Sequence, residues 1–423
     1  METKKIIQVD EKVPGNLLFP LSLQHMFAMF GASVLVPILF NINPSIVLLM
    51  NGVGTLLFIL ITKGKAPAYL GSSFAFLTPA GLVIAKWGYR DALGGFVAVG
   101  LMLCVLALIV YLFGVKWIDI VLPAAAMGPV VALIGLELAG SAAQTGGIVA
   151  TADSPIKMAN VIVFIVTLVV AVLGNVLFRK FFAVIPILIA IIAGYIAAVI
   201  THVVTPSMIS KAVHTSFFVI PNFETPHFNL QAILMIIPVI LVLASEHIGH
   251  QLVTSKIVER DLIKDPGLHR SLLADGISTT LSGFVGSVPT TTYGENIGVM
   301  AITKVYSVQV IGGAAIISIL SAFIGPVAAL IQTIPGPVIG GISFLLYGMI
   351  GASGIRVISD AQVDYSKSQN LILTSVVFVT GLSGVAVNIK DVTLKGMVLA
   401  CIVGMALSLL FYIFNKLGWA NDK

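Results

Sequence analysis

Long apolar stretches, separated by short polar segments, recur from Leu17 to Leu417. Most of them are about 18 to 25 residues long, which is the length a helix needs to cross the hydrocarbon core of a bilayer. The pattern predicts an all-α polytopic membrane protein with about fourteen transmembrane segments. The predicted spans cover residues 17–40, 44–62, 68–86, 90–114, 117–139, 159–178, 183–202, 229–254, 268–285, 288–307, 308–332, 335–354, 368–388 and 392–417.

The composition supports this class. Hydrophobic residues make up 58% of the chain and charged residues 10%, whereas soluble domains carry about 25% charged residues. The net charge of +5 does not indicate a nucleic-acid partner, because most basic residues lie at span ends. Cys104 and Cys401 both lie in apolar stretches, so the sequence indicates neither a disulfide framework nor a metal site, and no cofactor is expected.

The basic residues are distributed unequally between the two sides of the predicted spans. Most of the 23 Lys and Arg residues fall on the side that also holds both chain ends. Loops rich in Lys and Arg stay in the cytoplasm. We therefore expect a multi-pass protein of the cell membrane with both termini in the cytoplasm.

The chain divides into two halves with an odd number of spans in each. About seven spans lie in residues 1–202 and about seven in residues 229–423, with a connecting hinge at 203–228. An odd number forces the halves to insert with opposite orientations, which is the arrangement of many secondary transporters. The sequence therefore predicts two inverted repeats.

The third span of each half is interrupted by polar residues. Residues 69–81 and 286–298 are rich in glycine and hydroxyl side chains, contain proline and run into a short apolar helix. Paired interruptions at matching positions point to a transporter's binding site. We expect short extended segments that pair with each other, and helices whose first N–H groups face a cavity. The alternative is two unrelated polar loops.

Two carboxylates stand out at membrane depth. Glu295 lies in the second interrupted segment, and a carboxylate there is costly enough to indicate a functional site. Glu246 and His250 are four residues apart and therefore share one helical face. A carboxylate and an imidazole in that relation can hold a proton between them. The alternative for either histidine alone is a hydrogen bond that only fixes helix packing.

Other polar residues within the spans are less informative. His25 is expected to support the site rather than to bind a ligand, and His247 is interpreted as a packing or interfacial residue. Glu137 is expected near water at the end of its span. The role of Asp275 stays open between starting a helix and capping a partner. Tyr347 supplies either a hydroxyl from the opposite wall or ordinary aromatic packing.

Enzyme functions fit the sequence poorly. Glu246-His247-Ile248-Gly249-His250 differs from the His-Glu-x-x-His helix of zinc proteases, because here the glutamate precedes both histidines. An intramembrane hydrolase is thus a weak alternative. The chain has no G-x-x-x-x-G-K-[ST] phosphate loop, which disfavours an ATP-driven pump.

Residues 295–304, together with Gln24-His25 in the first span, resemble the signature of the nucleobase–ascorbate transporters. This family is also called nucleobase–cation symporter family 2. The resemblance covers essentially the whole chain and is greatest to the bacterial uracil-transporting members. It implies a core domain of spans 1–4 and 8–11 and a gate domain of spans 5–7 and 12–14. It further implies proton-coupled uracil uptake by alternating access, with purine or ascorbate transport in other members.

The same resemblance implies residue roles. Glu246 and Glu295 would bind the base, the backbone amides of Phe74 and Gly294 would donate to its carbonyls, and His250 would couple to Glu246. Tyr347 would lie on the gate side, and members can form dimers through the gate domain. The residues expected to support the site are His25, Gln24, Ser73, Tyr293 and Asn296. A purine permease stays open as an alternative, while an anion transporter is disfavoured because two carboxylates would repel an anion.

Overall fold

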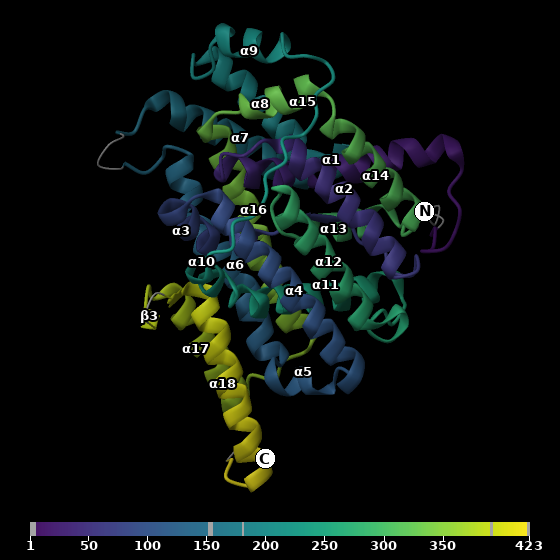
Figure 1. Cartoon of the computed structure of the whole chain (residues 1–423), viewed down its shortest axis with the longest axis vertical. Helices are drawn as coiled ribbons and strands as arrows, with labels where there is room; N and C mark the ends of the chain where they lie inside the picture. Colours follow the sequence, from purple (N-terminus) through teal and green to yellow (C-terminus); the bar gives the residue numbers. More distant parts are fainter. Residues whose placement is uncertain (1–5, 151–154, 180–181, 390–391, 421–423) are drawn as a thin grey trace.

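The computed structural model describes residues 6–150, 155–179, 182–389 and 392–420. Most of these residues are helical (Figure 1). Eight of the described helices are long and apolar enough to cross a membrane, and four shorter apolar helices accompany them. The expected helical polytopic membrane protein is therefore confirmed. The extreme chain ends, expected in the cytoplasm, lie outside the described residues.

In the described residues of the first half there are eight α-helices and one short strand. The 3-10 turns Phe74–Phe76 and Phe182–Val184 precede α3 and α8. The elements are α1 (Gly15–Leu39), α2 (Pro44–Ile61), β1 (Leu70–Ser72), α3 (Leu77–Trp87), α4 (Tyr89–Phe113), α5 (Lys116–Val121), α6 (Ala124–Thr145), α7 (Met158–Leu177) and α8 (Pro186–Ile200). The span expected at 117–139 is thus two helices. The chain breaks at Leu122-Pro123 because proline lacks an N–H and disfavours a helical residue before it.

The described elements of the second half follow a similar order, with an added pair of strands before the last helix. A short helix, α9 (Pro206–Val213), lies in the connecting segment, and one irregular turn, Ile263–Gly267, precedes α12. The elements are α10 (Leu230–Ile236), α11 (Val239–Val258), α12 (Leu268–Val285), β2 (Thr290–Thr292), α13 (Gly294–Thr303), α14 (Val308–Ala322), α15 (Gly325–Gln332), α16 (Gly336–Asp360), α17 (Ser368–Leu382), β3 (Ala386–Ile389), β4 (Val392–Lys395) and α18 (Gly396–Leu417).

The strands β3 and β4 differ from the all-α prediction. They pair antiparallel, with Ala386 opposite Lys395, where the last two spans were expected to continue to 388 and to begin at 392. Gly384, with φ of +75°, follows the end of α17. The β-branched residues beyond it favour extended backbone over a further helical turn.

Helices from the two halves pack against each other at the centre. The helix α2 packs on α14, α4 on α12 and α6 on α16, while α7 packs on α8 and α17 on α18. Figure 1 shows α12 and α13 beside α1 and α2, which are far away in the sequence. These contacts place the two interrupted segments in the interior of the molecule.

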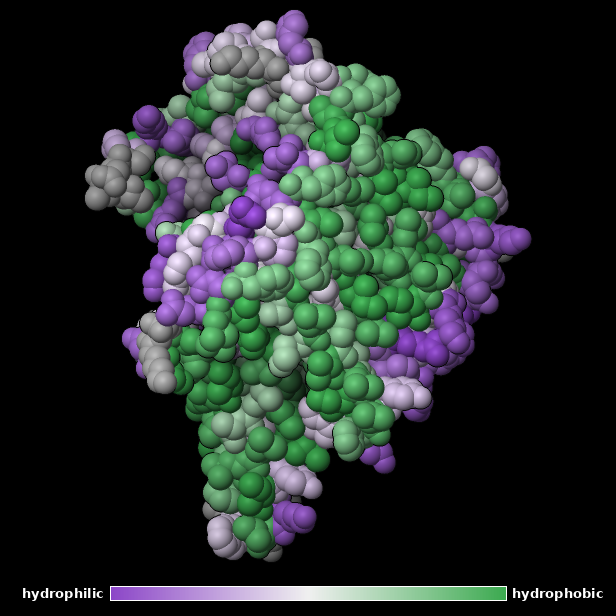
Figure 2. All heavy atoms as spheres, in the orientation of Figure 1, coloured by the Kyte–Doolittle hydropathy of each residue, from purple (hydrophilic) through white to green (hydrophobic). Residues whose placement is uncertain are grey.

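The outer surface is largely apolar. Figure 2 shows a broad hydrophobic area, and polar residues gather mainly away from its centre. Exposed large side chains lie on α4, α7 and α18, including Leu101, Tyr111, Val176, Leu177 and Ile413. Apolar side chains that remain exposed over several helices match the lipid tails of a bilayer.

Candidate functional site

The two interrupted segments form one antiparallel strand pair. In β1 and β2, Leu70 lies opposite Thr292 and Ser72 opposite Thr290. The Ser73 N–H donates to the Pro289 carbonyl at 2.9 Å, and the Tyr293 N–H donates to the Tyr69 carbonyl at 3.0 Å. Non-helical backbone at membrane depth must be satisfied within the protein. Each interrupted segment satisfies the other, so the expected pairing is observed.

Two glycines make this junction geometrically possible. The Tyr293 hydroxyl donates to the Ser72 carbonyl at 2.8 Å, and a Cβ at Gly71 would overlap the Tyr293 ring. Gly286 ends α12 with φ of +91°, in the left-handed region that other residues rarely adopt. The glycine content of these segments therefore serves close packing and chain reversal.

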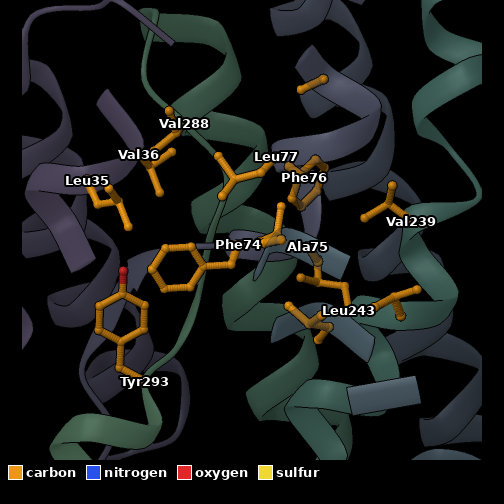
Figure 3. Close-up of a cluster of buried hydrophobic side chains, with 14 of the residues drawn as sticks. Leu35, Val36, Phe74, Ala75, Phe76, Leu77, Val239, Leu243, Val288 and Tyr293 are labelled. Atoms are coloured by element: carbon orange, nitrogen blue, oxygen red, sulfur yellow. The ribbon is translucent and has the colours of Figure 1, made fainter. Parts of the chain in front are cut away.

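A cavity of about 440 Å³ lies beside the strand pair, within the size range of small-molecule sites. One wall comes from α11 and α13 and the other from α6, α7, α8 and α16. Phe74 and Tyr293, which lie side by side in Figure 3, both line it. The polar lining residues are Asn175, Glu246, His250, Tyr293, Glu295, Ser353 and Arg356. Most of the remaining surface is apolar, so a bound molecule meets few polar groups.

Both expected carboxylates line the cavity, together with His250. Glu246 is buried, and its Oε2 has no hydrogen-bond partner in the described part of the chain. The expected contact between Glu246 and His250 is not among the ion pairs or hydrogen bonds found there. Instead, His250 Nδ1 lies 3.1 Å from the Thr292 hydroxyl of β2. Glu246 thus keeps an acceptor oxygen available to a ligand, and His250 is held by the strand.

The backbone donors expected for the ligand lie at two element starts. Phe74 begins the turn before α3, and Gly294 is the first residue of α13. Both line the cavity, and the first N–H groups of a helix have no intrahelical acceptor. Tyr347, by contrast, is 2% exposed and does not line the cavity. Its ring packs edge-to-face on Phe74 with centroids 5.8 Å apart.

Four of the five expected supporting residues, His25, Gln24, Ser73 and Asn296, do not line the cavity, whereas Tyr293 does. The Asn296 side-chain amide contacts His25 Nδ1 and donates to the His25 carbonyl, both at 3.1 Å. Gln24 and Ser73 are buried, and the Ser73 hydroxyl has no partner among the described residues. The contact between Asn296 and His25 joins α13 to α1, because the first span of one half packs on the third span of the other.

Asp275, whose role the sequence left open, contacts His247, which was interpreted as a packing or interfacial residue. His247 Nδ1 lies 2.7 Å from Asp275 Oδ2, and the two side chains are each 1% exposed. His247 is therefore a buried residue that joins α11 to α12 by a hydrogen bond, which agrees with its interpretation as a packing residue. The sequence contained two signs of this contact, namely a second histidine beside Glu246 and an acidic residue inside a span.

Glu137 makes a helix-capping contact. Its Oε2 accepts the Met397 N–H at 2.9 Å, so this carboxylate of α6 serves the first turn of α18. It was expected near water, and its partners lie instead within the protein.

Comparison with known proteins assigns the class. The model of the Permease family matches residues 17–390. The chain belongs to this family, as the nucleobase–cation symporter resemblance predicted, and is a transporter rather than an enzyme. It is 54% identical to a uracil permease of Escherichia coli (strain K12), over 98% of this chain and 96% of that protein. It is 52% identical to a uracil permease of Paenibacillus larvae, over 99% of both.

Solved structures show the same fold at low identity. The transmembrane domain of a cyanobacterial bicarbonate transporter, BicA, superposes with a TM-score of 0.61 at 15% identity. That match covers 96% of this chain and 98% of the other. SLC26A9 superposes with a TM-score of 0.67 at 12% identity, over 95% of this chain and 66% of the other. These likenesses concern the fold alone.

Proposed function

We propose that the protein carries uracil into the cell together with a proton by alternating access. The observation that carries this proposal is a single cavity of suitable size. It is lined by Glu246 and Glu295 and by the first residues of two elements, Phe74 and Gly294. The names of the relatives, uracil permeases at 54% and 52% identity, supply the substrate.

The lining groups complement uracil atom by atom. A uracil ring presents two N–H donors and two carbonyl acceptors in one plane. Glu246 and Glu295 supply acceptors, while the backbone amides of Phe74 and Gly294 supply donors. The Phe74 ring, fixed edge-to-face on Tyr347, offers an apolar surface to the base. On this assignment Tyr347 acts through Phe74 rather than by contacting the substrate.

A coupled proton supplies the driving force. Uracil is neutral, so the membrane potential alone does not concentrate it. Glu246 is the proposed proton carrier because its carboxylate is buried and Oε2 has no partner among the described side chains. An isolated carboxylate in that environment favours the protonated, neutral state when no cation is near.

The pairing of helices supports two inverted repeats of seven spans. In this arrangement each helix of one repeat has a counterpart in the other. When each helix is replaced by its counterpart, the α2–α14 contact becomes the α12–α4 contact, and the α7–α8 contact becomes the α17–α18 contact. The same replacement matches the broken segment α5–α6 with α15–α16. We propose a core of spans 1–4 and 8–11 and a gate of spans 5–7 and 12–14, with repeats at 1–202 and 229–423 joined by 203–228.

The position of the cavity supports an inward-open conformation, which we include in the proposal. It extends from Glu246 past Ser353 to Arg356 near the end of α16. With both termini in the cytoplasm, that end faces the cytoplasm, and the site is open inward. A homodimer through the apolar faces of the gate domain completes the proposal, with lipid covering the rest.

An anion substrate, suggested by the fold of BicA and SLC26A9, fits the site less well. Glu246 and Glu295 would repel it, and Arg356 is paired with Asp360 at 3.6 Å. A purine substrate differs from uracil in ring size, so competition distinguishes the two.

The test is uptake of radiolabelled uracil into proteoliposomes, with and without an inward acid gradient. We expect accumulation only with the gradient, its loss on adding a protonophore, and weaker competition by xanthine and uric acid than by unlabelled uracil. Preferential competition by xanthine would identify a purine permease. Uptake that ignores the gradient would contradict proton coupling.

A further inference from the structure

Outside the cavity, the structure contains one buried ionisable pair that the proposed mechanism does not use. His247 of α11 and Asp275 of α12 are joined at 2.7 Å, and neither lines the cavity. The His247 Nε2 atom lies 2.8 Å from the Ser271 hydroxyl, and the Ser271 hydroxyl donates to the Leu268 carbonyl at 3.0 Å. Both ring nitrogens therefore have partners.

These contacts favour one arrangement of protons in the pair. We assign the Ser271 hydroxyl proton to the Leu268 carbonyl, so the hydroxyl accepts from His247 Nε2, which then carries a proton. The 2.7 Å contact between His247 Nδ1 and Asp275 Oδ2 requires a second proton between the two atoms. Whether that proton sits on the ring or on the carboxylate, the pair as a whole is neutral.

The pair also holds strand β2. The Thr291 hydroxyl donates to Asp275 Oδ2 at 3.4 Å, and Thr291 lies opposite Gly71 in the strand pair. Three residues further along, Gly294 and Glu295 line the cavity. Asp275 is thus connected through one strand residue to the groups proposed to bind the base.

The other ionisable groups near the pair belong to the site. Glu246 and His250 lie on α11 together with His247, and Glu295 lies on α13, which packs against α11. From α2 the pair meets the apolar ring of Phe58, 6.5 Å from the His247 ring. From α4, the Cys104 thiol approaches Gly276, next to Asp275. Among the described residues, His247 is therefore the ionisable side chain in direct contact with Asp275.

We propose that His247 and Asp275 form a fixed, neutral pair, joined by one shared proton, that positions β2 and shields Glu246 from the Asp275 charge. Both are positioning residues: they act through β2 and Glu246 and do not touch the substrate. This inference rests on the proposed proton-coupled uracil transport. It predicts that the pH dependence of uracil binding comes from Glu246 and not from Asp275.

The test compares single and double substitutions in the purified full-length protein. His247→Gln removes the partner of Asp275 and leaves two unpaired buried carboxylates, Asp275 and Glu246, which disfavour each other's ionisation. A nearby negative charge favours protonated Glu246, so the pH midpoint of uracil binding should rise by about one unit. His247→Gln/Asp275→Asn restores neutrality and should return the midpoint to the wild-type value. The second substitution thereby rescues the first.

Thr279→Val is the matched control. The Thr279 hydroxyl donates to the Thr290 carbonyl of β2 at 2.9 Å, so this variant loses a buried, uncharged bond from the same helix to the same strand. It should lower the melting temperature and leave the pH midpoint unchanged. A midpoint shift in Thr279→Val equal to that of His247→Gln would assign the effect to strand position alone and overturn the electrostatic part.

The outcomes separate this inference from the proposed function. If the wild-type protein shows no pH-dependent uracil binding, the proposed function fails. If the wild type binds as expected but His247→Gln and the double variant have the same midpoint, the pair has no shielding role. Should His247→Gln fail to fold, Asp275→Asn alone provides the test, because His247 then becomes neutral. That variant should retain the wild-type midpoint, and a shift in it would overturn the inference.

Discussion

The Tyr293 hydroxyl donates a hydrogen bond to the Ser72 carbonyl across 221 residues of sequence, and its ring occupies the space that a side chain at Gly71 would fill. This one residue thereby joins both interrupted segments and lines the cavity.

Tyr293→Phe should lower the melting temperature, because it removes this bond, at about 1 kcal/mol, while keeping the ring. Thermal unfolding in detergent measures the change. Gly71→Ala should be more harmful, since its Cβ would overlap the ring and overpacking costs about 1–3 kcal/mol. A Gly71→Ala protein as stable as the wild type would contradict the packing described here.

Glu295→Ala should weaken uracil binding by roughly 5- to 150-fold, the equivalent of 1–3 kcal/mol for a buried N–H left without an acceptor. Isothermal titration of the purified variant measures this loss. Glu295→Gln is the control, because it keeps one acceptor oxygen and should bind better than the alanine variant. Wild-type affinity in Glu295→Ala would remove this residue from the site.

Glu246→Gln should retain some uracil binding but lose accumulation driven by a pH gradient, because the amide cannot ionise. Binding and proteoliposome uptake, measured on the same preparation, separate the two effects. His250→Ala should weaken coupling less directly, since His250 contacts Thr292 rather than Glu246. Normal gradient-driven uptake by Glu246→Gln would place the transported proton elsewhere, with His25 as the next candidate.

Labelling should reveal movement of the gate helix α16. A cysteine replacing Ser353, which lines the cavity, should react with a polar thiol reagent and be protected by uracil. Ser343, on the same helix, is 2% exposed and serves as the buried control. The background should lack Cys104 and Cys401. Equal labelling of the Ser353 position with and without uracil would count against alternating access at this wall.

Glu137→Ala should destabilise the protein by about 1–3 kcal/mol, because it leaves the Met397 N–H without its acceptor. Glu137→Gln keeps an acceptor oxygen and should be close to wild type. Thermal unfolding compares the two, and equal loss in both would show that the negative charge, rather than the hydrogen bond, stabilises the start of α18.

The sequence predicted the membrane class well, because hydropathy marks the long apolar helices. It also pointed to Phe74, Glu246, His250, Gly294 and Glu295, which line the cavity, and to Tyr347, which does not. It missed features that depend on partners distant along the chain. His247 and Asp275 are 28 residues apart on different helices, so no local periodicity connects them. The contact of His250 with Thr292 instead of Glu246 has the same cause, since β2 supplies a partner that i,i+4 spacing cannot reveal. The strands β3 and β4 were hidden because Val, Ile and Leu residues are as hydrophobic in a strand as in a span.

The pairing of β1 with β2 also constrains how the chain is made. A ribosome adds about 5–20 residues per second. Roughly 10–40 s therefore pass between the synthesis of Ser72 and that of its partner Tyr293, 221 residues later. During that interval the polar backbone of Leu70–Ser72 lacks the strand that satisfies it, and lipid cannot replace that strand. The substrate site therefore cannot be assembled during translation of the first half alone; it is completed only when Thr290–Thr292 has entered the membrane.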